Sequence, residues 1–458
     1  MSSRGSAAAD RGTAVVIGGG LAGCLAAWAL HGVAERVVVV ERDRYPDGVD
    51  FRPGVPQAKH GHLLLEAGQR TLDELLPGVL AELLAAGAAR VPLAGGLRWL
   101  TAAGWLAPYE SGGGGEGQAA GAGALAVLTC SRPLIDHAVL RRVRAAPNIE
   151  FRTGTEVTGL LGDRHTVTGV RLSGRGGAGA AETELSAGLV VDAAGRSTRA
   201  ARWLSLIGAP AVPRERVDAG VSYATRFYHR PADAPADSAL YLQSRAPGEG
   251  RFGVLLPVEG DRWIVGMGGM RGFEPSIQPE EFEKQLGQLR DPGIADAVAG
   301  AKPTGPARGF VPGPSVWRHY ERSAPAGFLA IGDSSCTFNP VYGQGMTVAS
   351  LGALALREAV HRHGDLGPAA VRETRDAIAG VTRNPWQMAV GEDVRFAGTT
   401  GGPSGFQVRL QQRLLDRVLE RAVTDARIAE AFHRVAAMVE PPTLLFRPSV
   451  LGPVLFGS

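Results

Sequence analysis

Cysteine is scarce in this chain. Only Cys24, Cys130 and Cys336 occur among 458 residues, and none of them belongs to a CxxC pair. This spacing argues against a disulfide framework and against a zinc site. It suits a reducing compartment, and we expect the protein to work in the cytoplasm.

Long apolar runs are also missing. No uncharged apolar stretch reaches about 18 residues, so the sequence predicts no transmembrane segment. Residues 1–12 are small and polar without the apolar centre of a signal peptide, and we expect a disordered tail there. Residues 441–458 are rich in Leu, Phe, Val and Pro. They predict either a packed irregular tail or a surface that contacts a membrane or an apolar partner.

Charge of one sign is not concentrated anywhere. The net charge is +3, and the basic residues are scattered arginines without a long Lys/Arg run. This argues against nucleic acid as the main partner. The 45% of hydrophobic residues is typical of a globular protein with a large core.

The first clear structural pattern is a βαβ unit near the N-terminus. Residues 13–17 (TAVVI) and 36–41 (RVVVVE) are apolar enough for buried parallel strands. Residues 21–30 between them carry apolar side chains at helical spacing. Such a unit needs roughly 30 residues, which these segments span.

A GxGxxG motif joins the first strand to the helix. Gly18 permits the tight turn, Gly20 lets the backbone approach a pyrophosphate, and Gly23 allows helix and strand to pack closely. Glu41 ends the second strand, where its carboxylate can bind a ribose diol. The motif alone does not separate FAD from NAD, and a glycine turn without a ligand is the structural alternative. The predicted contacts are Gly18, Gly20, Leu21, Ala22, Gly23, Glu41 and Arg42.

A second polar anchor lies in the last third of the chain. The strand-like residues 327–332 (GFLAIG) deliver Asp333 to a loop that ends at a helix over 345–359. Asp333 can accept a hydrogen bond from a sugar-alcohol hydroxyl, although it can equally cap a turn. The N–H groups of Gly345 and Met346 can face an electron-rich ring edge.

Taken together, these motifs resemble the flavoprotein monooxygenases of the para-hydroxybenzoate hydroxylase type. The resemblance rests on the GxGxxG with Glu41, on Asp192–Ser197 (DAAGRS) after a strand, and on Gly332–Asp333 with Pro340, Gly343 and Gly345. Arg132 resembles the arginine by which the family contacts FAD. The resemblance covers the chain up to about residue 360 and implies FAD as the cofactor. Its further implied contacts are His60, Arg132, Asp192, Asp333, Gly343, Gly345 and Met346.

The implied fold is α/β. It consists of a Rossmann-like FAD-binding domain, an inserted antiparallel β-sheet substrate domain and a helical C-terminal region. We expect the FAD-binding domain over 13–110, 125–215 and 305–365, with a Gly-rich surface loop at 112–123. The substrate domain is expected over 216–304 and the helical region over 366–458.

Two segments resemble a narrower branch, the actinobacterial polyene and polyether flavin epoxidases of the monensin and lasalocid epoxidase type. They are Val55–Leu65 (VPQAKHGHLLL) and Phe338–Thr347 (FNPVYGQGMT). The resemblance implies insertion of one oxygen atom from O₂ through a flavin C4a-hydroperoxide. The expected substrate is an alkene of a small apolar polyketide or terpenoid-like secondary metabolite, as in antibiotic biosynthesis.

No catalytic side chain stands out, because the flavin supplies such chemistry. The flavin-proximal loop is predicted at Pro340, Val341 and Gly343. His60 and His62 lack a third ligand, so we expect no metal. Aromatic hydroxylation would need a base, for which Tyr223, Tyr241 and His229 are candidates. The predicted wall of the substrate pocket is Phe227, Tyr241, Leu255 and Trp263.

Other functions of the same fold stay open. They are aromatic hydroxylation, a reductase or dehydrogenase of the geranylgeranyl reductase type, and an FAD-loaded binding protein. Flavin halogenases carry a Trp-x-Trp-x-Ile-Pro stretch and a lysine, whereas residues 252–257 read FGVLLP and Lys59 has other neighbours. No second dinucleotide motif appears, so NAD(P)H would reduce FAD directly or through a flavin reductase. The oligomeric state is left open.

Overall fold

The computed structural model describes residues 12–110, 124–174, 182–235 and 238–456. The predicted N-terminal tail, apart from Gly12, and the predicted Gly-rich loop at 112–123 lie outside the described residues. The fold is mixed α/β, as the sequence predicts.

A five-stranded parallel sheet forms the first layer, in the order β19-β11-β1-β2-β7. The predicted βαβ unit is confirmed with its predicted bounds, because β1, α1 and β2 span Thr13–Ile17, Leu21–Leu30 and Arg36–Glu41. Every residue of β1 is buried, as a central parallel strand requires. The other strands are β7 (Ile149–Thr153), β11 (Leu189–Asp192) and β19 (Phe328–Ala330).

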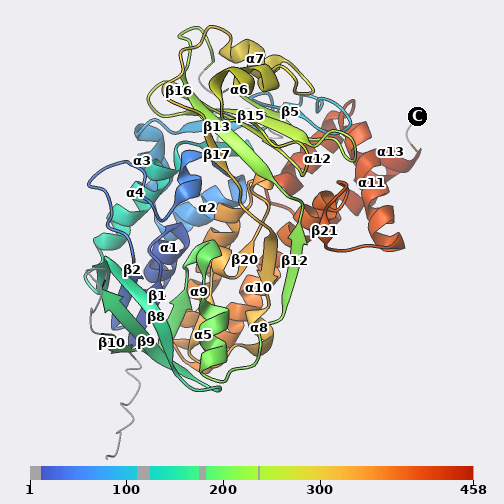
Figure 1. The fold of residues 1–458 in the computed structure, drawn as a ribbon. Coiled ribbons are helices and arrows are strands. Elements are labelled where there is room, and N and C mark those ends of the chain that lie inside the picture. The colour runs from blue at the N-terminus through green and yellow to red at the C-terminus, as the bar shows by residue number, and fades with distance from the viewer. Residues whose placement is uncertain (1–11, 111–123, 175–181, 236–237, 457–458) are drawn as a thin grey trace, which may run out of the picture.

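A six-stranded sheet forms the second layer, in the order β17-β13-β16-β15-β14-β5. It lies above the parallel sheet in Figure 1, and α6 (Pro279–Leu286) and α7 (Gly293–Val298) cover its outer face. The antiparallel strands predicted around 251–257 and 262–268 are confirmed. The strands are β5 (Leu97–Leu100), β13 (Ser222–His229), β14 (Ala239–Leu242), β15 (Arg251–Val258), β16 (Arg262–Gly269) and β17 (Arg308–Phe310).

This second sheet draws on more of the chain than residues 216–304. β5 pairs in parallel with β14, and β17 pairs with β13. Both added strands lie outside the bounds expected for the substrate domain, since edge strands this short carry too little sequence pattern to assign.

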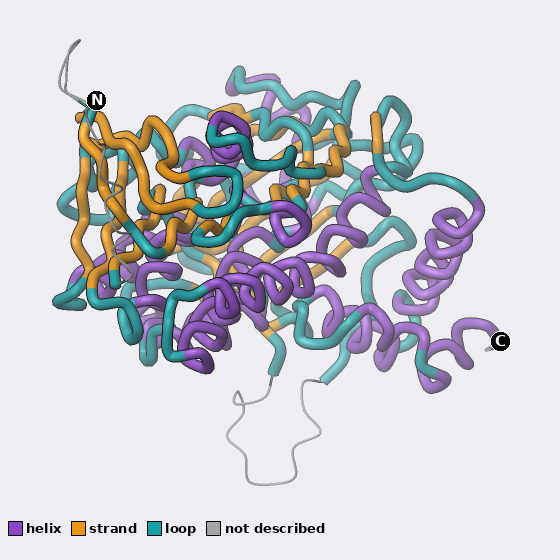
Figure 2. Tube along the Cα trace, turned by 90° about the horizontal axis from the view of Figure 1, so that it is seen from below, coloured by secondary structure: helices purple, strands orange, loops and turns teal. Residues whose placement is uncertain are grey.

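Helices fill the space beside and behind the sheets. α9 (Gly345–His363) packs on α1 and α10 (Pro368–Asp393), and the helical C-terminal region is confirmed by α10 to α13. Figures 1 and 2 place the last helices in a lobe at one end of the molecule. They are α11 (Phe406–Ala422), α12 (Ala426–Ala436) and α13 (Pro448–Phe456).

Other helices and strands complete the fold. They are β3 (Leu63–Leu64), α2 (Glu66–Leu75), α3 (Val79–Ala85), β4 (Ala89–Pro92), β6 (Ala126–Thr129), α4 (Arg132–Arg144), β8 (Thr155–Gly162), β9 (Val167–Gly174), β10 (Thr183–Ser186), α5 (Ala200–Leu206), β12 (Arg214–Asp218), β18 (Ser315–Arg318), α8 (Tyr320–Ser323), β20 (Cys336–Thr337) and β21 (Thr400–Gly401).

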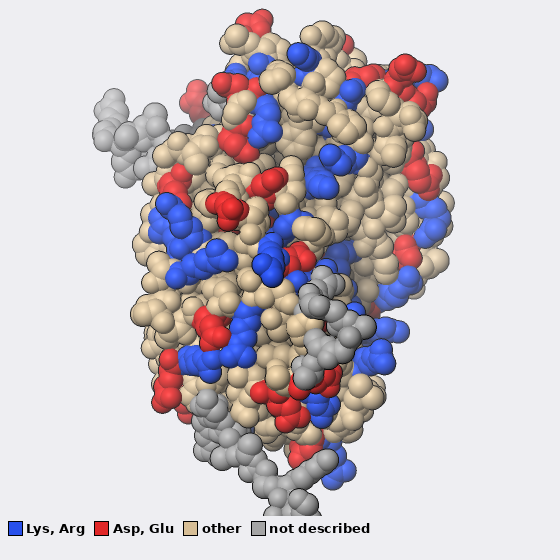
Figure 3. All heavy atoms as spheres, turned by 60° about the vertical axis from the view of Figure 1, so that its left-hand side comes forward, with Lys and Arg blue, Asp and Glu red and all other residues tan. Residues whose placement is uncertain are grey.

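Basic and acidic side chains are interspersed on the face shown in Figure 3. Opposite charges also form ion pairs in the structure: Glu82 pairs with both Arg141 and Arg142, and Glu150 pairs with both Arg36 and Arg152. Among the described residues, no helix is both long enough and apolar enough to cross a membrane.

Candidate functional site

A cavity of about 650 Å³ separates the two sheets. One wall is the carboxyl end of β1, β2 and β11, where parallel-sheet proteins commonly bind ligands. The opposite wall is the inner face of β13, β15 and β16, and the start of α9 closes one side. The volume lies within the range of cofactor and small-molecule sites.

The glycines of the first loop have the geometry that a phosphate cradle needs. Gly18 has φ +95°, and a Cβ on Gly23 would lie 1.9 Å from the Gly18 carbonyl oxygen. A Cβ on Gly20 would enter open space, its nearest neighbour being Arg52 Nη2 at 3.6 Å. The first N–H groups of α1 have no acceptor within the helix and meet the cavity at Gly20 and Leu21.

Glu41 holds this cradle in shape from the end of β2. Its Oε2 accepts from the Gly19 N–H at 2.7 Å and pairs with Arg52 Nη1 at 3.0 Å, while Oε1 accepts from the Asp43 N–H. The carboxylate still faces the cavity with lone pairs to spare. The sequence does not predict the role of Arg52, because a single arginine in a long loop carries no local signal.

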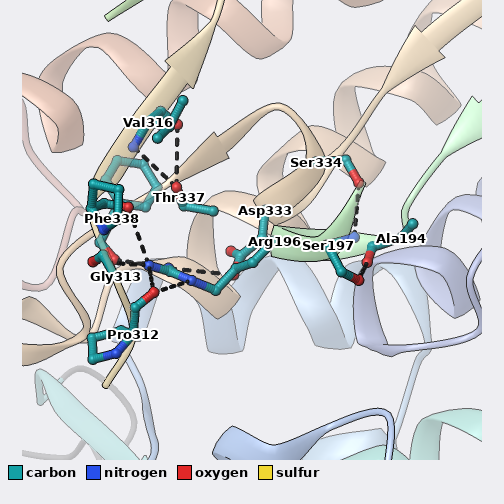
Figure 4. Close-up of polar contacts among 12 residues, drawn as sticks. Ala194, Arg196, Ser197, Pro312, Gly313, Val316, Asp333, Ser334, Thr337 and Phe338 are labelled. Atoms are coloured by element: carbon teal, nitrogen blue, oxygen red, sulfur yellow. Dashed lines mark hydrogen bonds and ion pairs between the residues drawn. The ribbon is translucent and has the colours of Figure 1, made fainter. Parts of the chain in front are cut away.

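Asp333 lies on the far side of the cavity, among three arginines. Burial raises the pKa of Asp333, and the charges of Arg196, Arg132 and Arg318 oppose that rise. Arg196 Nη1 lies 4.0 Å from Asp333 Oδ2. Figure 4 shows the Arg196 guanidinium beside Asp333, where it donates to the carbonyl of Pro312. Arg132 is oriented by Asp136, at 2.8 Å.

Asp192 has a structural position instead of a cavity-lining one. Its side chain is fully buried and accepts hydrogen bonds from the Ala194 N–H, from Ser334 Oγ and from Thr198 Oγ1. Ser334 Oγ also accepts from the Gly195 N–H at 2.8 Å. These bonds connect the loop after β11 to the loop after β19, so Asp192 fixes Asp333 and Arg196 indirectly.

The predicted flavin-proximal loop lines the cavity and is held from behind. Asn339 Nδ2 and the Tyr342 hydroxyl both donate to Asp393 Oδ1, at 2.7 and 2.9 Å. Asp393 is the last residue of α10, and burial raises its pKa to about 6. The loop passes through Gly343 at φ +67° into the N-terminus of α9.

Of the two histidines, the sequence predicts His60 as a cofactor contact, but it is His62 that lines the cavity. His60 Nδ1 bonds Thr225 Oγ1 at 2.9 Å, and His60 does not line the cavity. His62 does line it, and its Nδ1 bonds the His60 carbonyl oxygen at 2.9 Å. Burial, and then the Arg132 charge, lower the pKa of His62 to about 3. His62 is therefore neutral, with Nδ1 as the donor.

The substrate-side wall differs from the prediction. Leu255 and Trp263 point to the opposite face of the sheet, into the core against α6 and α7, because side chains alternate along a strand. Phe227 and Tyr241 pack in the same cluster as the cavity-lining residues Val254 and Leu256, but they do not line the cavity themselves. The residues of this sheet that do line the cavity are Tyr223, Thr225, Phe252, Val254, Leu256, Gly266, Met267 and Phe310.

Most predicted cofactor contacts do meet in the cavity. Gly23, His60 and Asp192 lie behind its surface, with the packing and bonding roles given above. The predicted residues that line it are Gly18, Gly20, Leu21, Ala22, Glu41, Arg42, Arg132, Asp333, Pro340, Val341, Gly343, Gly345 and Met346.

The chain is 32% identical over 445 residues to the protein Rv3254 of Mycobacterium tuberculosis. The match covers 95% of this chain and 91% of that protein. The chain belongs to the Rv3254 family. The name Rv3254 states no activity, and no protein-family model matches the chain.

Several solved structures that share the fold are of flavin-dependent proteins or flavoproteins. The flavin-dependent brominase Bmp2 has a TM-score of 0.63 and 16% identity, with 93% of this chain and 92% of that one covered. PqsL, a probable FAD-dependent monooxygenase from Pseudomonas aeruginosa, has a TM-score of 0.60 and 20% identity, over 84% and 98%. A flavoprotein/dehydrogenase from Cytophaga hutchinsonii has a TM-score of 0.66 and 13% identity, over 93% and 92%. At these identities the similarity shows that this chain has the same fold as those proteins, and it shows nothing further.

Proposed function

We propose that this member of the Rv3254 family binds FAD in the cavity and is an FAD-dependent monooxygenase. The observation that carries the proposal is one continuous cavity that joins a phosphate cradle to an uncharged sheet wall. It is supported by the shared fold of Bmp2, a flavin-dependent brominase, and PqsL, a probable FAD-dependent monooxygenase.

The residues present fit FAD along the length of the cavity. The open side of Gly20 admits a pyrophosphate, and Glu41 would accept from a ribose diol. Asp333 would accept from the ribityl chain, with Arg132 on the same side. The N–H groups of Gly345 and Met346, at the positive end of α9, would stabilise the ring when it carries negative charge.

Bound and reduced, FAD would supply the oxygen-activating chemistry. The chain's own residues bind the substrate, orient it and exclude water. Among the described lining residues, all the charged ones lie outside β13, β15, β16 and β17. A neutral, apolar substrate therefore fits the sheet wall better than a carboxylate or an amine does. The charged lining residues are Glu41, Arg42, Arg52, Arg132, Glu156, Arg196, Arg199 and Asp333.

Within monooxygenation we propose epoxidation of an alkene in an apolar polyketide or terpenoid-like metabolite. Alkene attack requires no base from the protein, whereas hydroxylation of a phenol does. Of Tyr223, Tyr241 and His229, only Tyr223 lines the cavity. Burial raises the pKa of Tyr223, so its phenol stays protonated and is a poor base. Lys59, the candidate for halogenation, is not among the lining residues.

The electron donor in this proposal is NAD(P)H, either docking directly or acting through a separate flavin reductase. We propose the same division into an FAD-binding part, which would contribute the charged walls of the cavity, and a β-rich substrate part, which would contribute the uncharged wall. β5 and β17 are added to the latter because they pair with β14 and β13.

The test is to reconstitute the purified protein with FAD and to follow O₂ consumption with NAD(P)H, with and without an added reductase. Apolar polyene probes would be supplied under isotopically labelled O₂. The proposal expects one labelled oxygen atom in an epoxide product. Hydrogenated polyene without label would favour the reductase alternative. A labelled phenol formed from an apolar aromatic probe in a parallel assay would favour the aromatic hydroxylase.

A further inference from the structure

Helix α11 in the C-terminal lobe has one buried face and one unusual exposed face. Val418, Leu419 and Ala422 are buried, and they belong to the inner side of the helix. Phe406 and Leu410 are exposed, by 69% and 54%, although surface helices normally turn polar residues outward. The exposed apolar pair lies one turn apart, so both side chains protrude on the same side.

Arginines flank this apolar pair. Arg409, Arg413 and Arg417 are exposed on the same helix, and the spacing 406, 410, 413, 417 defines one continuous face. Through their side chains, none of the three arginines forms an ion pair or a hydrogen bond with another described residue.

Acidic side chains near this face are few. Asp416 is engaged by Arg395 at 2.7 Å, and exposed Glu420 lies on the same face one turn after Arg417, at the end distant from Phe406. The part of the face from Phe406 to Arg413 is therefore positive and apolar together. This combination is the one by which interfacial helices bind membranes with anionic lipids.

The C-terminal segment that follows adds to the same lobe. Leu445 and Val450 are buried in one cluster with Val418 of α11, so the described part of residues 441–458 is packed. Phe446 nevertheless stays 45% exposed, next to exposed Arg447.

We propose that the exposed face of α11 docks the protein on a membrane surface rich in anionic lipids. Phe406 and Leu410 would enter the boundary between headgroups and acyl chains, and the three arginines would contact lipid phosphates. The combination of exposed apolar side chains with arginines that have no described side-chain partner matches a layer that offers lipid phosphates above an apolar interior. The inference is independent of the proposed oxygenase reaction, since docking requires no turnover.

The test is co-sedimentation of the full-length purified protein with vesicles. One set contains phosphatidylcholine alone, and the other contains phosphatidylcholine with phosphatidylglycerol. Two double variants address the two components: Phe406→Ser with Leu410→Ser, and Arg413→Gln with Arg417→Gln. The matched control is Arg202→Gln with Leu206→Ser on α5, where Leu206 is 73% exposed and Arg202 lies one turn before it.

We expect the wild-type protein to bind the anionic vesicles, less strongly as salt is raised, and to leave the neutral ones largely unbound. Each arginine near an anionic surface contributes about fivefold to partitioning, so the arginine variant should lose roughly 25-fold. The apolar variant should lose about tenfold or more. The α5 control should bind like wild type.

Equal binding to both vesicle types, or full binding by both α11 variants, would overturn the proposal. Analytical ultracentrifugation of the same proteins tests whether a second copy of the chain, instead of a membrane, covers the exposed face of α11. A wild-type dimer that the apolar α11 variant dissociates, without vesicle binding, would assign the face to a second copy and overturn membrane docking.

Discussion

Gly20 and Gly23 lie in the same turn but serve different physical purposes. Gly20 has φ −78°, an ordinary conformation, and its missing Cβ leaves space in the cavity. The missing Cβ of Gly23 instead permits contact with the Gly18 carbonyl. One substitution should therefore affect the ligand and the other the fold.

Gly20→Ala should keep the thermal stability of the FAD-free protein and weaken FAD binding about tenfold or more, equivalent to ~1.4 kcal/mol. Gly23→Ala should destabilise the FAD-free protein by ~2 kcal/mol or more, because the added methyl group meets backbone. Thermal melts without FAD and FAD titration followed by absorbance measure the two effects. Equal loss of stability in both variants would refute this division.

Asp393 gives a pH-dependent prediction. Its pKa is raised from 3.8 to about 6 in the folded protein, so stability falls as the pH rises from about 4 through 6. A pKa that is higher by about two in the folded than in the unfolded protein corresponds to ~3 kcal/mol of stability. Asp393→Asn keeps an oxygen that accepts from Asn339 and Tyr342 but never ionises.

The stability of Asp393→Asn relative to wild type should therefore rise by ~1–3 kcal/mol between pH 4 and pH 7.5. Urea denaturation at several pH values measures this difference, in which other titrating groups largely cancel. Tyr342→Phe should move the pH range of this stability change upward, because it removes a hydrogen bond that lowers the pKa of Asp393. A difference that stays flat with pH would contradict the assignment.

At the residue scale, the sequence predicts contacts that lie within a motif and misses those that depend on the path of a loop. Gly20, Glu41 and Asp333 are set by short-range pattern and meet the cavity. Arg52 reaches Glu41 from eleven residues downstream, and only the folded loop brings the two together. Which of His60 and His62 lines the cavity likewise depends on the folded loop, because the His60 ring bonds Thr225 of β13 and leaves His62 at the cavity.

At the scale of elements, β15 presents alternate residues to different surroundings. Val254 and Leu256 face the cavity, whereas Leu255 is 3% exposed in the core below α6 and α7. The sequence identifies this strand correctly. It does not identify its inner face, because apolar residues occupy both faces of a sheet covered on both sides.

Val254→Phe should reduce the cavity and lower substrate oxygenation with little loss of stability. Leu255→Ala should destabilise the fold by ~2–5 kcal/mol, as other buried leucine truncations do, and leave the spectrum of bound flavin unchanged. Denaturant unfolding and flavin absorbance on both variants test the assignment of faces. It fails if Leu255→Ala changes the flavin environment and Val254→Phe does not.

At the scale of the whole molecule, the C-terminal helices are part of the site's support. Asp393 of α10 holds the loop at 339–343, and Arg395 connects the end of α10 to Asp416 of α11. The sequence predicts that this region is helical from its periodicity. It cannot predict the support, because a buried carboxylate 54 residues from Asn339 has no local pattern.

The central claim is that FAD occupies the cavity and reacts there with O₂. The most direct measurement is rapid-mixing absorption spectroscopy, in which the FAD-loaded protein is reduced without oxygen and then mixed with oxygenated buffer. We expect a transient absorption band that differs from both reduced and oxidised flavin, and that decays faster when an apolar alkene is present. A slow, direct return to the oxidised spectrum with alkenes present would contradict oxygenation. A protein that acquires no flavin spectrum after addition of FAD would contradict the assignment of the cavity itself.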